Sequence, residues 1–344
     1  MRDGVRSGRR WRVCSRTAFI PFASLAALVT LSCSCMDDGP SGPGQDPTGP
    51  LAGVEFWAYQ LQDQTEGGNM QLLGESHYDM LVIDQTRSLA GEEWYDSAGD
   101  VAYLHSTDGS QGDPKIVVCY IDVGEAEDYR YYWQQGWQVG DPEWIAGEDP
   151  DGWDGNYPVL FWYDEWQDIV AGYLDRIIED GYDGIYLDWL EVYDFGPVDS
   201  AAAAQGLDAE EELISYVQWI EQYAHARDPG LVIVAQNASE MGTYSEYVAV
   251  FDAIAQEAIW FDGGGDPDTG DVLGDVPVDP DLTQEYLDCL ADWQALGKPV
   301  FDVEYCEQPT NVEEAYSSGE SEGYVTYCTL TPLDGLTQDP PPGY

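Results

Sequence analysis

The chain has 344 residues, with 66 acidic against 12 basic side chains, and it is rich in aromatic residues, with 13 Trp and 24 Tyr. This length fits one large domain, and the lack of a basic stripe argues against a nucleic-acid partner, because nothing would neutralise the phosphates. The aromatic residues suit a sizeable core and also a groove that stacks flat ligands such as sugar rings.

The acidity is concentrated after the N-terminal segment. From Cys33 onward there are 65 acidic and six basic residues, a net charge of −59. Two explanations stay open and are compatible with each other. An acidic surface keeps a protein soluble in a halophilic source, which we favour because the chain has only two lysines, Lys115 and Lys298. Alternatively, the charge steers a cationic substrate to an acidic cleft.

The N-terminus predicts an export signal over residues 1–35. Six arginines lie in the first sixteen positions, and an apolar stretch of fifteen residues follows, which is short for a membrane span. Cys33 and Cys35 are candidates for lipidation of the bacterial lipoprotein type, and this lipid would be the only membrane contact. We therefore expect an extracytoplasmic protein, either secreted or lipid-anchored at the cell surface.

The remaining chain divides into a linker and one domain. Residues 36–50 are rich in Gly, Pro and Asp and predict a flexible linker. Residues 51–338 form the predicted domain, for which we expect a monomer. Its four cysteines contain no CxxC motif, so zinc and thioredoxin-like sites have no support. Cys306 and Cys328 are the preferred disulfide pair, with buried free thiols as the open alternative.

Eight short apolar runs alternate with helical patterns along the domain. The runs are 53–61, 78–84, 115–125, 182–188, 231–238, 251–260, 298–305 and 323–330. Amphipathic helices are predicted over 165–180, 208–226 and 283–297, where apolar residues recur at three- and four-residue spacing. This alternation predicts an α/β fold, a (β/α)₈ TIM-like barrel in a single domain. An open doubly wound sheet is the alternative, without a nucleotide site because no GxGxxG follows the first strand.

Polar side chains, mostly acidic or amide, follow the predicted strands. They include Gln60, Asp84, Asp122, Glu125, Asp188, Glu191, Gln236, Asn237, Glu257 and Glu304. In a barrel these strand ends meet at the face that carries the active site. Nucleophilic Ser or Cys catalysis usually needs a His base, and none of the three histidines ends a strand. Glycoside hydrolysis needs only two carboxyl groups, one protonated and one ionised. No cofactor is expected.

Four motifs resemble glycoside hydrolase family 114, whose name-giving activity is endo-α-1,4-polygalactosaminidase. They are "VVCYIDVGEAEDYRYYW" (117–133), "GYDGIYLDWLEVYD" (181–194), "VAQNASE" (234–240) and "IAQEAIW" (254–260). The resemblance covers roughly residues 53–335 and implies a TIM-like barrel. The stretch "YLDWLE", where fungal members carry D-x-D-N, resembles the prokaryotic branch of the family.

The resemblance implies a catalytic pair of Asp188 as nucleophile and Glu257 as general acid/base, with Glu304 as a rival for the second role. A retaining pair stands about 5–5.5 Å apart. The predicted substrate contacts are Tyr59, Asp122, Glu125, Tyr186, Glu191, Asn237, Trp260, Glu304 and Tyr305.

The sequence therefore favours an exported, retaining endo-glycosidase that acts on an amino-sugar-containing polysaccharide of the α-1,4-galactosaminan kind. A non-catalytic carbohydrate-binding barrel is one alternative. A divalent-metal-binding barrel is another, with Asp122, Glu125 and Asp188 as the candidate ligands.

Overall fold

A single parallel sheet of eight strands forms the centre of the protein. The computed structural model describes residues 49–150, 152–266 and 270–337. The strands are β1 (Trp57–Gln60), β2 (Met80–Ile83), β3 (Ile116–Asp122), β6 (Gly184–Asp188), β7 (Val232–Gln236), β8 (Ala253–Glu257), β11 (Val300–Tyr305) and β12 (Val325–Thr329). Their order in the sheet is their order in the chain. All eight predicted strands are therefore confirmed.

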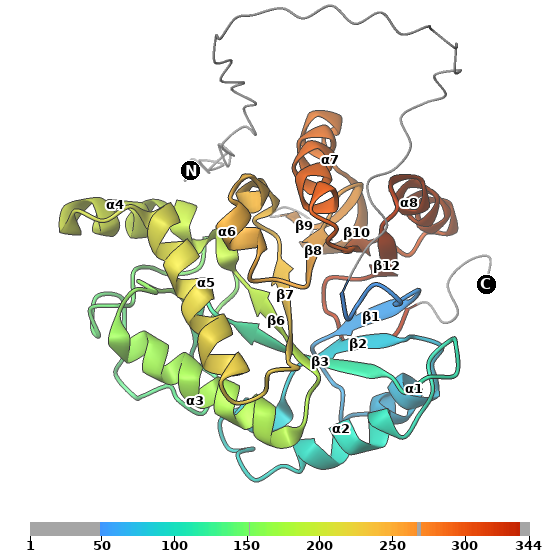
Figure 1. Ribbon diagram of the computed structural model, residues 1–344, viewed down its shortest axis with the longest axis horizontal. Coiled ribbons are helices and arrows are strands. Elements are labelled where there is room, and N and C mark those ends of the chain that lie inside the picture. Colours follow the sequence, from blue (N-terminus) through green and yellow to red (C-terminus); the bar gives the residue numbers. More distant parts are fainter. Residues whose placement is uncertain (1–48, 151, 267–269, 338–344) are drawn as a thin grey trace, which may run out of the picture.

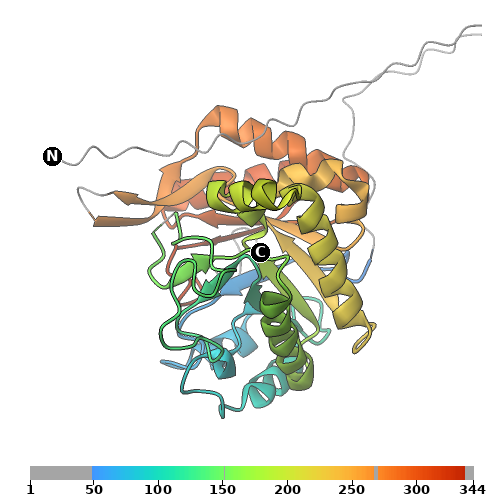
Figure 2. The same ribbon diagram turned by 90° about the vertical axis from the view of Figure 1, so that its left-hand side faces the viewer.

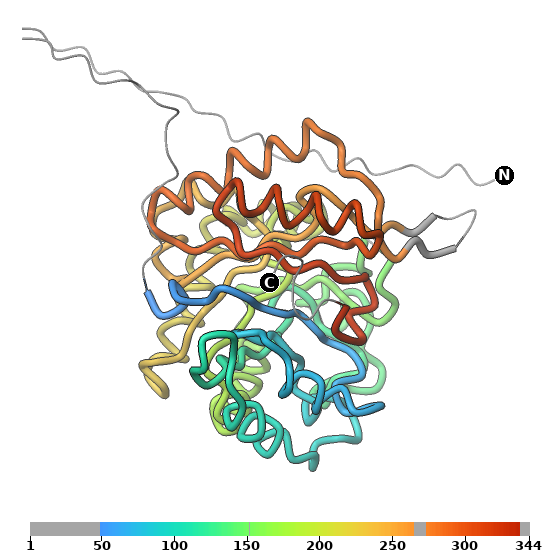
Figure 3. Tube along the Cα trace, turned by 90° about the vertical axis from the view of Figure 1, so that its right-hand side faces the viewer, coloured from blue at the N-terminus to red at the C-terminus, as the bar shows by residue number. Residues whose placement is uncertain are grey.

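The first and last strands of the sheet lie next to each other. The indole Nε1 of Trp57 on β1 donates a hydrogen bond of 2.7 Å to the carbonyl oxygen of Val325 on β12. Figures 1 and 3 show the blue first strand beside the red last one. The sheet is a nearly closed barrel of the (β/α)₈ type, as predicted, and the doubly wound alternative is wrong because its strand order would reverse.

Helices surround the barrel on the outside (Figure 1). They are α1 (Asn69–Glu75), α2 (Ser97–His105), α3 (Asp164–Asp180), α4 (Gly196–Gln205), α5 (Ala209–His225), α6 (Ser245–Val248), α7 (Pro280–Ala295) and α8 (Pro309–Glu322). Helix α3 buries Trp166, Val170 and Leu174 at helical spacing, and it ends at Gly181, whose φ of 82° suits a glycine cap. Asp208 caps α5 by accepting from two backbone amides of its first turn. The predicted helices are confirmed within a few residues.

Two antiparallel hairpins interrupt the barrel pattern. Strand β4 (Glu125–Glu127) pairs with β5 (Asn156–Pro158) inside the long segment between β3 and α3. Strand β9 (Phe261–Asp266) pairs with β10 (Gly270–Pro277) between β8 and α7. The second hairpin, in orange, extends away from the barrel in Figure 2. Both hairpins follow the C-terminal ends of barrel strands and so belong to the face where a barrel carries its active site.

Alternation along the strands decides which side chains enter the barrel. The registers pair Tyr120 with Tyr186 and Asp122 with Asp188 across β3 and β6, and Val303 with Glu257 across β11 and β8. Side chains two residues apart share a face of a strand. The inner face therefore carries aromatic residues below and carboxylates at the C-terminal rim.

The predicted export signal over 1–35, with Cys33 and Cys35, lies outside the described residues, as does nearly all of the linker over 36–50. In the part of the chain that the structure describes, no helix combines the length and apolarity needed to cross a membrane. Cys306 and Cys328 are buried thiols that share a small apolar cluster at the edge of β11 and β12. The structure therefore has these two cysteines as free thiols, the alternative to the preferred pair.

Candidate active site

Asp188 is the last residue of β6 and is half-buried at the C-terminal end of the barrel. Its Oδ2 accepts a hydrogen bond of 2.6 Å from the Tyr120 hydroxyl on the neighbouring β3. Its Oδ1 accepts from the backbone N–H of Trp189, also at 2.6 Å. Two donors from two elements thus fix the orientation of this carboxylate.

Glu257 is the last residue of β8 and is likewise half-buried. Its Oε2 accepts from the side-chain amides of Gln236 at 2.5 Å and Asn237 at 3.1 Å. Its Oε1 accepts from the hydroxyl of Tyr305, the last residue of β11. The backbone N–H of Glu257 donates to Asn237 Oδ1 at 3.0 Å. Groups from both flanking strands and the following loop therefore hold Glu257.

The backbone leaves the sheet sharply at these positions. Trp189, Asn237 and Ala258 directly follow β6, β7 and β8, and each has a positive φ between 53° and 58°. Non-glycine residues in this region store strain and gather at functional sites. A Cβ on Gly124 would stand 2.1 Å from the carbonyl oxygen of Trp189, so the loop after β3 packs directly on the turn beside Asp188.

The two carboxylates influence each other electrostatically. Burial, and after it the negative charge of Glu257, raises the pKa of Asp188 to about 7, while hydrogen bonds from Tyr120 and Trp189 act in the opposite direction. The raised pKa lets Asp188 hold a proton near neutral pH while a second carboxyl group lies close to it. Two neighbouring carboxyl groups, one protonated and one ionised, are the arrangement that acid-assisted glycoside hydrolysis requires.

Two tyrosines line the barrel beneath the pair. The rings of Tyr59 and Tyr186 lie 5.2 Å apart, centre to centre. Burial, followed by nearby charges that include both Asp188 and Glu257, raises the pKa of each phenol. Among the described residues, the buried Tyr186 hydroxyl has no hydrogen-bond partner. Both predicted contacts thus lie beside Asp188 and Glu257.

Asp122 and Glu125 form an acidic shelf next to Asp188 and are 3% and 1% exposed. Asp122 Oδ1 accepts from the backbone amides of Gly124 and Glu125, while its Oδ2 is buried without a partner among the described residues. Burial, then the charge of Glu125, raises the pKa of Asp122. Burial, then Asp149, raises the pKa of Glu125 to about 10. Glu125 is therefore largely protonated at neutral pH, and burial favours the protonated form of Asp122 in the same direction.

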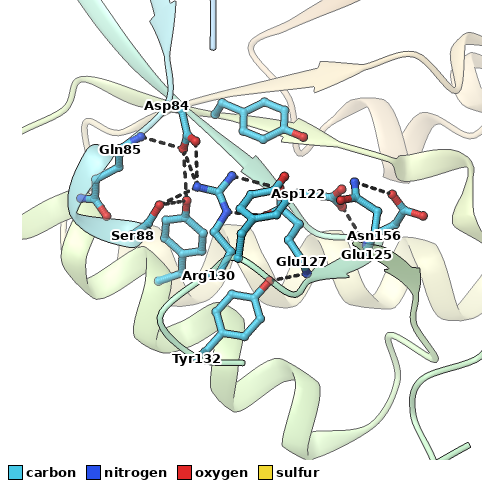
Figure 4. A network of polar contacts seen from close by, with 12 residues as sticks. Asp84, Gln85, Ser88, Asp122, Glu125, Glu127, Arg130, Tyr132 and Asn156 are labelled. Carbon is cyan, nitrogen blue, oxygen red and sulfur yellow. Dashed lines mark hydrogen bonds and ion pairs between the residues drawn. The ribbon is translucent and has the colours of Figure 1, made fainter. Parts of the chain in front are cut away.

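One buried arginine supports this shelf from behind. The Arg130 guanidinium binds Asp84 at 2.7 Å, Glu127 at 2.6 Å and Ser88 at 2.6 Å. Figure 4 shows this network from close by. Burying a guanidinium is expensive unless it is paired and hydrogen-bonded on several sides. Sequence reasoning missed Arg130 and also Asn156, which donates to Glu125 at 3.2 Å. The sequence feature that could have indicated Arg130 is that it is a lone basic residue in the acidic stretch 122–130.

The structure places two predicted substrate contacts away from the pair. Glu304 is fully buried and lies on the outer face of β11, where its oxygens accept from the backbone amides of residues 259–261. Trp260 is half-buried and its ring lies 6.3 Å from that of Tyr324, which precedes β12. These placements do not fit substrate contacts or a rival acid, because both side chains pack outside the barrel lumen.

The other predicted residues gather around the pair. Asn237 and Tyr305 bind Glu257 directly, and so act on the carboxylate itself. Glu191 lies in the short helix after β6 (Leu190–Asp194), and its charge contributes to raising the pKa of Tyr186. Among the described residues no group of three His, Cys, Asp or Glu side chains is arranged to hold a metal ion. The metal-binding alternative is therefore not supported.

Solved structures share this fold. The glycoside hydrolase domain of PelA from Pseudomonas aeruginosa superposes with a TM-score of 0.60 at 20% identity, covering 83% of this chain and 99% of that one. Ega3 from Aspergillus fumigatus, in complex with galactosamine, gives a TM-score of 0.55 at 18% identity, covering 87% of this chain and 98% of that one. At these identities the likeness concerns the fold.

Sequence relatives cover nearly the whole domain. An uncharacterized protein of Deinococcus radiodurans is 31% identical over 299 residues, 87% of either chain. An uncharacterized protein of Thermotoga maritima is 28% identical over 289 residues, 81% of either chain. The profile of glycoside-hydrolase family GH114 matches residues 42–340, which include every strand of the barrel and both carboxylates of the pair. The chain belongs to glycoside hydrolase family 114.

Proposed function

We propose that the protein is a retaining endo-glycosidase that cleaves an amino-sugar-containing polysaccharide with Asp188 and Glu257 as its catalytic pair. The observation that carries this proposal is the arrangement of the pair. Two half-buried carboxyl groups end different strands at one face of the barrel, each held by its own donors, and the charge of Glu257 helps to raise the pKa of Asp188. Membership of a glycoside hydrolase family supports a carbohydrate substrate.

In this mechanism Asp188 is the nucleophile. An ionised Asp188 oxygen bonds to the anomeric carbon while the bond to the leaving oxygen breaks, and that oxygen takes the proton of Glu257. Glu257 then removes a proton from water, whose oxygen displaces Asp188 and restores both groups. The Tyr120 hydroxyl keeps Asp188 oriented, and the Tyr305 hydroxyl does the same for Glu257.

The acidic shelf supports an amino sugar as substrate. Asp122 Oδ2 is a buried acceptor without a partner among the described residues, and Asp188 is one of the charges acting on it. A sugar ammonium group would supply the missing donor and would favour the ionised carboxylate. Binding would then release a proton, so we expect affinity to rise with pH. The galactosamine bound to the structurally similar Ega3 agrees with this choice.

The substrate class is tested by comparing three α-1,4-linked polymers. We expect oligosaccharide release from galactosaminan with free amino groups, little from its fully N-acetylated form and none from a neutral glucan, with mass spectrometry as the readout. Proton NMR of the first product should show the α anomer. Binding without cleavage would replace the enzyme by a carbohydrate-binding barrel, and an initial β anomer would reject retention.

We also propose that the protein is exported and acts as a monomer, either secreted or anchored through a lipid on Cys33 or Cys35. The Arg-rich start and the apolar stretch of the sequence support export. Metabolic labelling with palmitate, compared between wild type and the Cys33→Ala, Cys35→Ala double variant, distinguishes the two fates. A labelled wild type and an unlabelled variant mean an anchor, and unlabelled protein in the medium means secretion.

A further inference from the structure

Glu304 occupies an unusual position behind the catalytic end of the barrel. It lies on β11 between Val303 and Tyr305, whose side chains enter the barrel, so the Glu304 side chain leaves on the opposite face. It is 0% exposed. Its neighbour on that face, Asp302, is equally buried, accepts from the Thr326 hydroxyl at 3.0 Å and interacts directly with the Glu304 carboxyl group.

The carboxylate of Glu304 binds three consecutive backbone amides. Oε1 accepts from Ile259 at 2.8 Å and from Trp260 at 3.1 Å, and Oε2 accepts from Trp260 at 3.1 Å and Phe261 at 2.5 Å. Successive N–H groups that converge on one anion form a nest. This nest begins two residues after Glu257.

The segment between Glu257 and the nest is also fixed. Ala258 has a φ of 53°, and its N–H donates to the Val303 carbonyl at 2.8 Å. The chain therefore leaves β8 through one strained residue and is held at once by β11, first through the backbone of Val303 and then through the side chain of Glu304. Only Ala258 separates the nest from Glu257, so a displacement of the nest is passed on to Glu257 through a single residue.

Only a carboxylate satisfies this nest. The amides of Ile259 and Phe261 belong to buried residues, and a buried N–H without an acceptor costs roughly 1–3 kcal/mol. A glutamine offers a single acceptor oxygen and turns an NH₂ group toward the remaining donors. An aspartate keeps both oxygens but is one methylene shorter.

We propose that Glu304 is a positioning residue for Glu257, holding the turn after β8 so that the Glu257 carboxyl keeps its place as proton donor. The expected effect of Glu304 on reaction rates rests on the proposed hydrolase activity. Its expected effect on the position of Glu257 does not. If Glu304 acts through the proton donor, its loss should slow only those substrates whose leaving group needs protonation.

The kinetic test uses Glu304→Gln with Asp79→Asn as the control. Asp79 precedes β2 at the opposite end of the barrel, and its oxygens likewise accept from three backbone amides, those of Glu55, Phe56 and Ser110. On galactosaminan oligomers we expect kcat to fall about 30- to 100-fold in Glu304→Gln, with KM nearly unchanged. On an aryl glycoside with an activated leaving group the fall should be about threefold or less. Asp79→Asn should stay within about threefold on both substrates. An equal fall on both substrates in Glu304→Gln, or no fall at all, overturns the proposal.

A second measurement is independent of turnover. Glutamate labelled with ¹³C at the carboxyl carbon reports the titration of Glu257, whose resonance is identified by its absence in Glu257→Gln. Glu304→Gln should shift this titration and speed amide hydrogen exchange at residues 259–261, while Asp79→Asn changes neither. An unchanged titration or unchanged exchange overturns the proposal. Both changes in a protein without hydrolase activity would uphold the positioning role and reject the proposed function.

Folding is checked by circular dichroism before either test. If Glu304→Gln does not fold, Glu304→Asp replaces it, because it keeps both acceptor oxygens at a longer reach. The expected pattern is the same with smaller changes, and a folded Glu304→Asp that behaves as wild type in both tests contradicts the proposal.

Discussion

Asp188 should set the acidic limb of the pH profile. Burial and the charge of Glu257 raise its pKa to about 7, and a nucleophile must be ionised. We therefore predict that kcat/KM for wild type decreases about tenfold per pH unit below pH 7. Initial rates at low substrate concentration between pH 4 and 9 provide the measurement. A profile that is flat below pH 7 and falls above it would make Asp188 the proton donor instead.

The same pKa has a consequence for stability. The folded pKa lies above the ordinary Asp value of 3.8, so the protonated form is the favoured one in the fold. This contribution is fully present below about pH 4 and is lost as the pH rises through about 7. Asp188→Asn, which cannot ionise, should thus be more stable than wild type by about 1–3 kcal/mol at pH 8 and nearly equal at pH 4. Urea unfolding at both pH values measures this, and a difference independent of pH would refute it.

Part of the site could be predicted from individual residues of the sequence. Asp188 and Glu257 end apolar runs and match family motifs, and the structure puts them at one end of the barrel. Glu304 was placed with them because it also lies near a strand end. The alternation of Phe301, Val303 and Tyr305 toward the lumen excludes it, since these apolar and aromatic residues occupy the inner face. Assigning Glu304 to the outer face requires the register of the strand, which follows from tertiary packing.

At the level of elements, Arg130 connects the end of β2 with the hairpin strand β4. It is 1% exposed and pairs with both Asp84 and Glu127. Arg130→Met would leave two buried carboxylates without their cation, which costs about 3–5 kcal/mol. We expect a loss of that size in urea unfolding. Arg227→Met is the control, since Arg227 pairs with Asp175 at the surface and should cost about 0.5 kcal/mol. Equal losses would contradict the role of Arg130.

The barrel elements were predictable and the hairpins were not. Near-continuous apolar runs with intervening amphipathic helices indicate buried parallel strands, and all eight runs became strands. The strand β4 has the sequence "EAE", which carries no strand signal, and it forms because Arg130 and Asn156 satisfy its glutamates. Strand β9 has the sequence "FDGGGD", in which glycines hide the strand pattern. Pairing with a second strand, β5 for β4 and β10 for β9, completes both elements.

The whole molecule carries a net charge of −54. Repulsion among so many carboxylates destabilises the compact state, and salt screens it, with a Debye length that falls from about 10 Å at 0.1 M to about 3 Å at 1 M. We predict that the melting temperature rises steadily with sodium chloride up to 1 M. Sodium sulfate at equal ionic strength separates screening from surface exclusion, which sulfate adds. A melting temperature insensitive to sodium chloride would show that the acidic surface does not limit stability.

The central claim is that Asp188 and Glu257 together cleave a glycosidic bond, and turnover of the two single variants tests it most directly. Galactosaminan with free amino groups is digested by wild type, Asp188→Asn and Glu257→Gln, and the released oligosaccharides are quantified by mass spectrometry. Asp183→Asn serves as the control, because Asp183 precedes the same strand at its opposite end and accepts from His105 and the Val117 amide. We predict that each catalytic variant folds but loses at least about 10³-fold in rate, while the control keeps its activity. Product release by either catalytic variant at the wild-type rate would contradict the account.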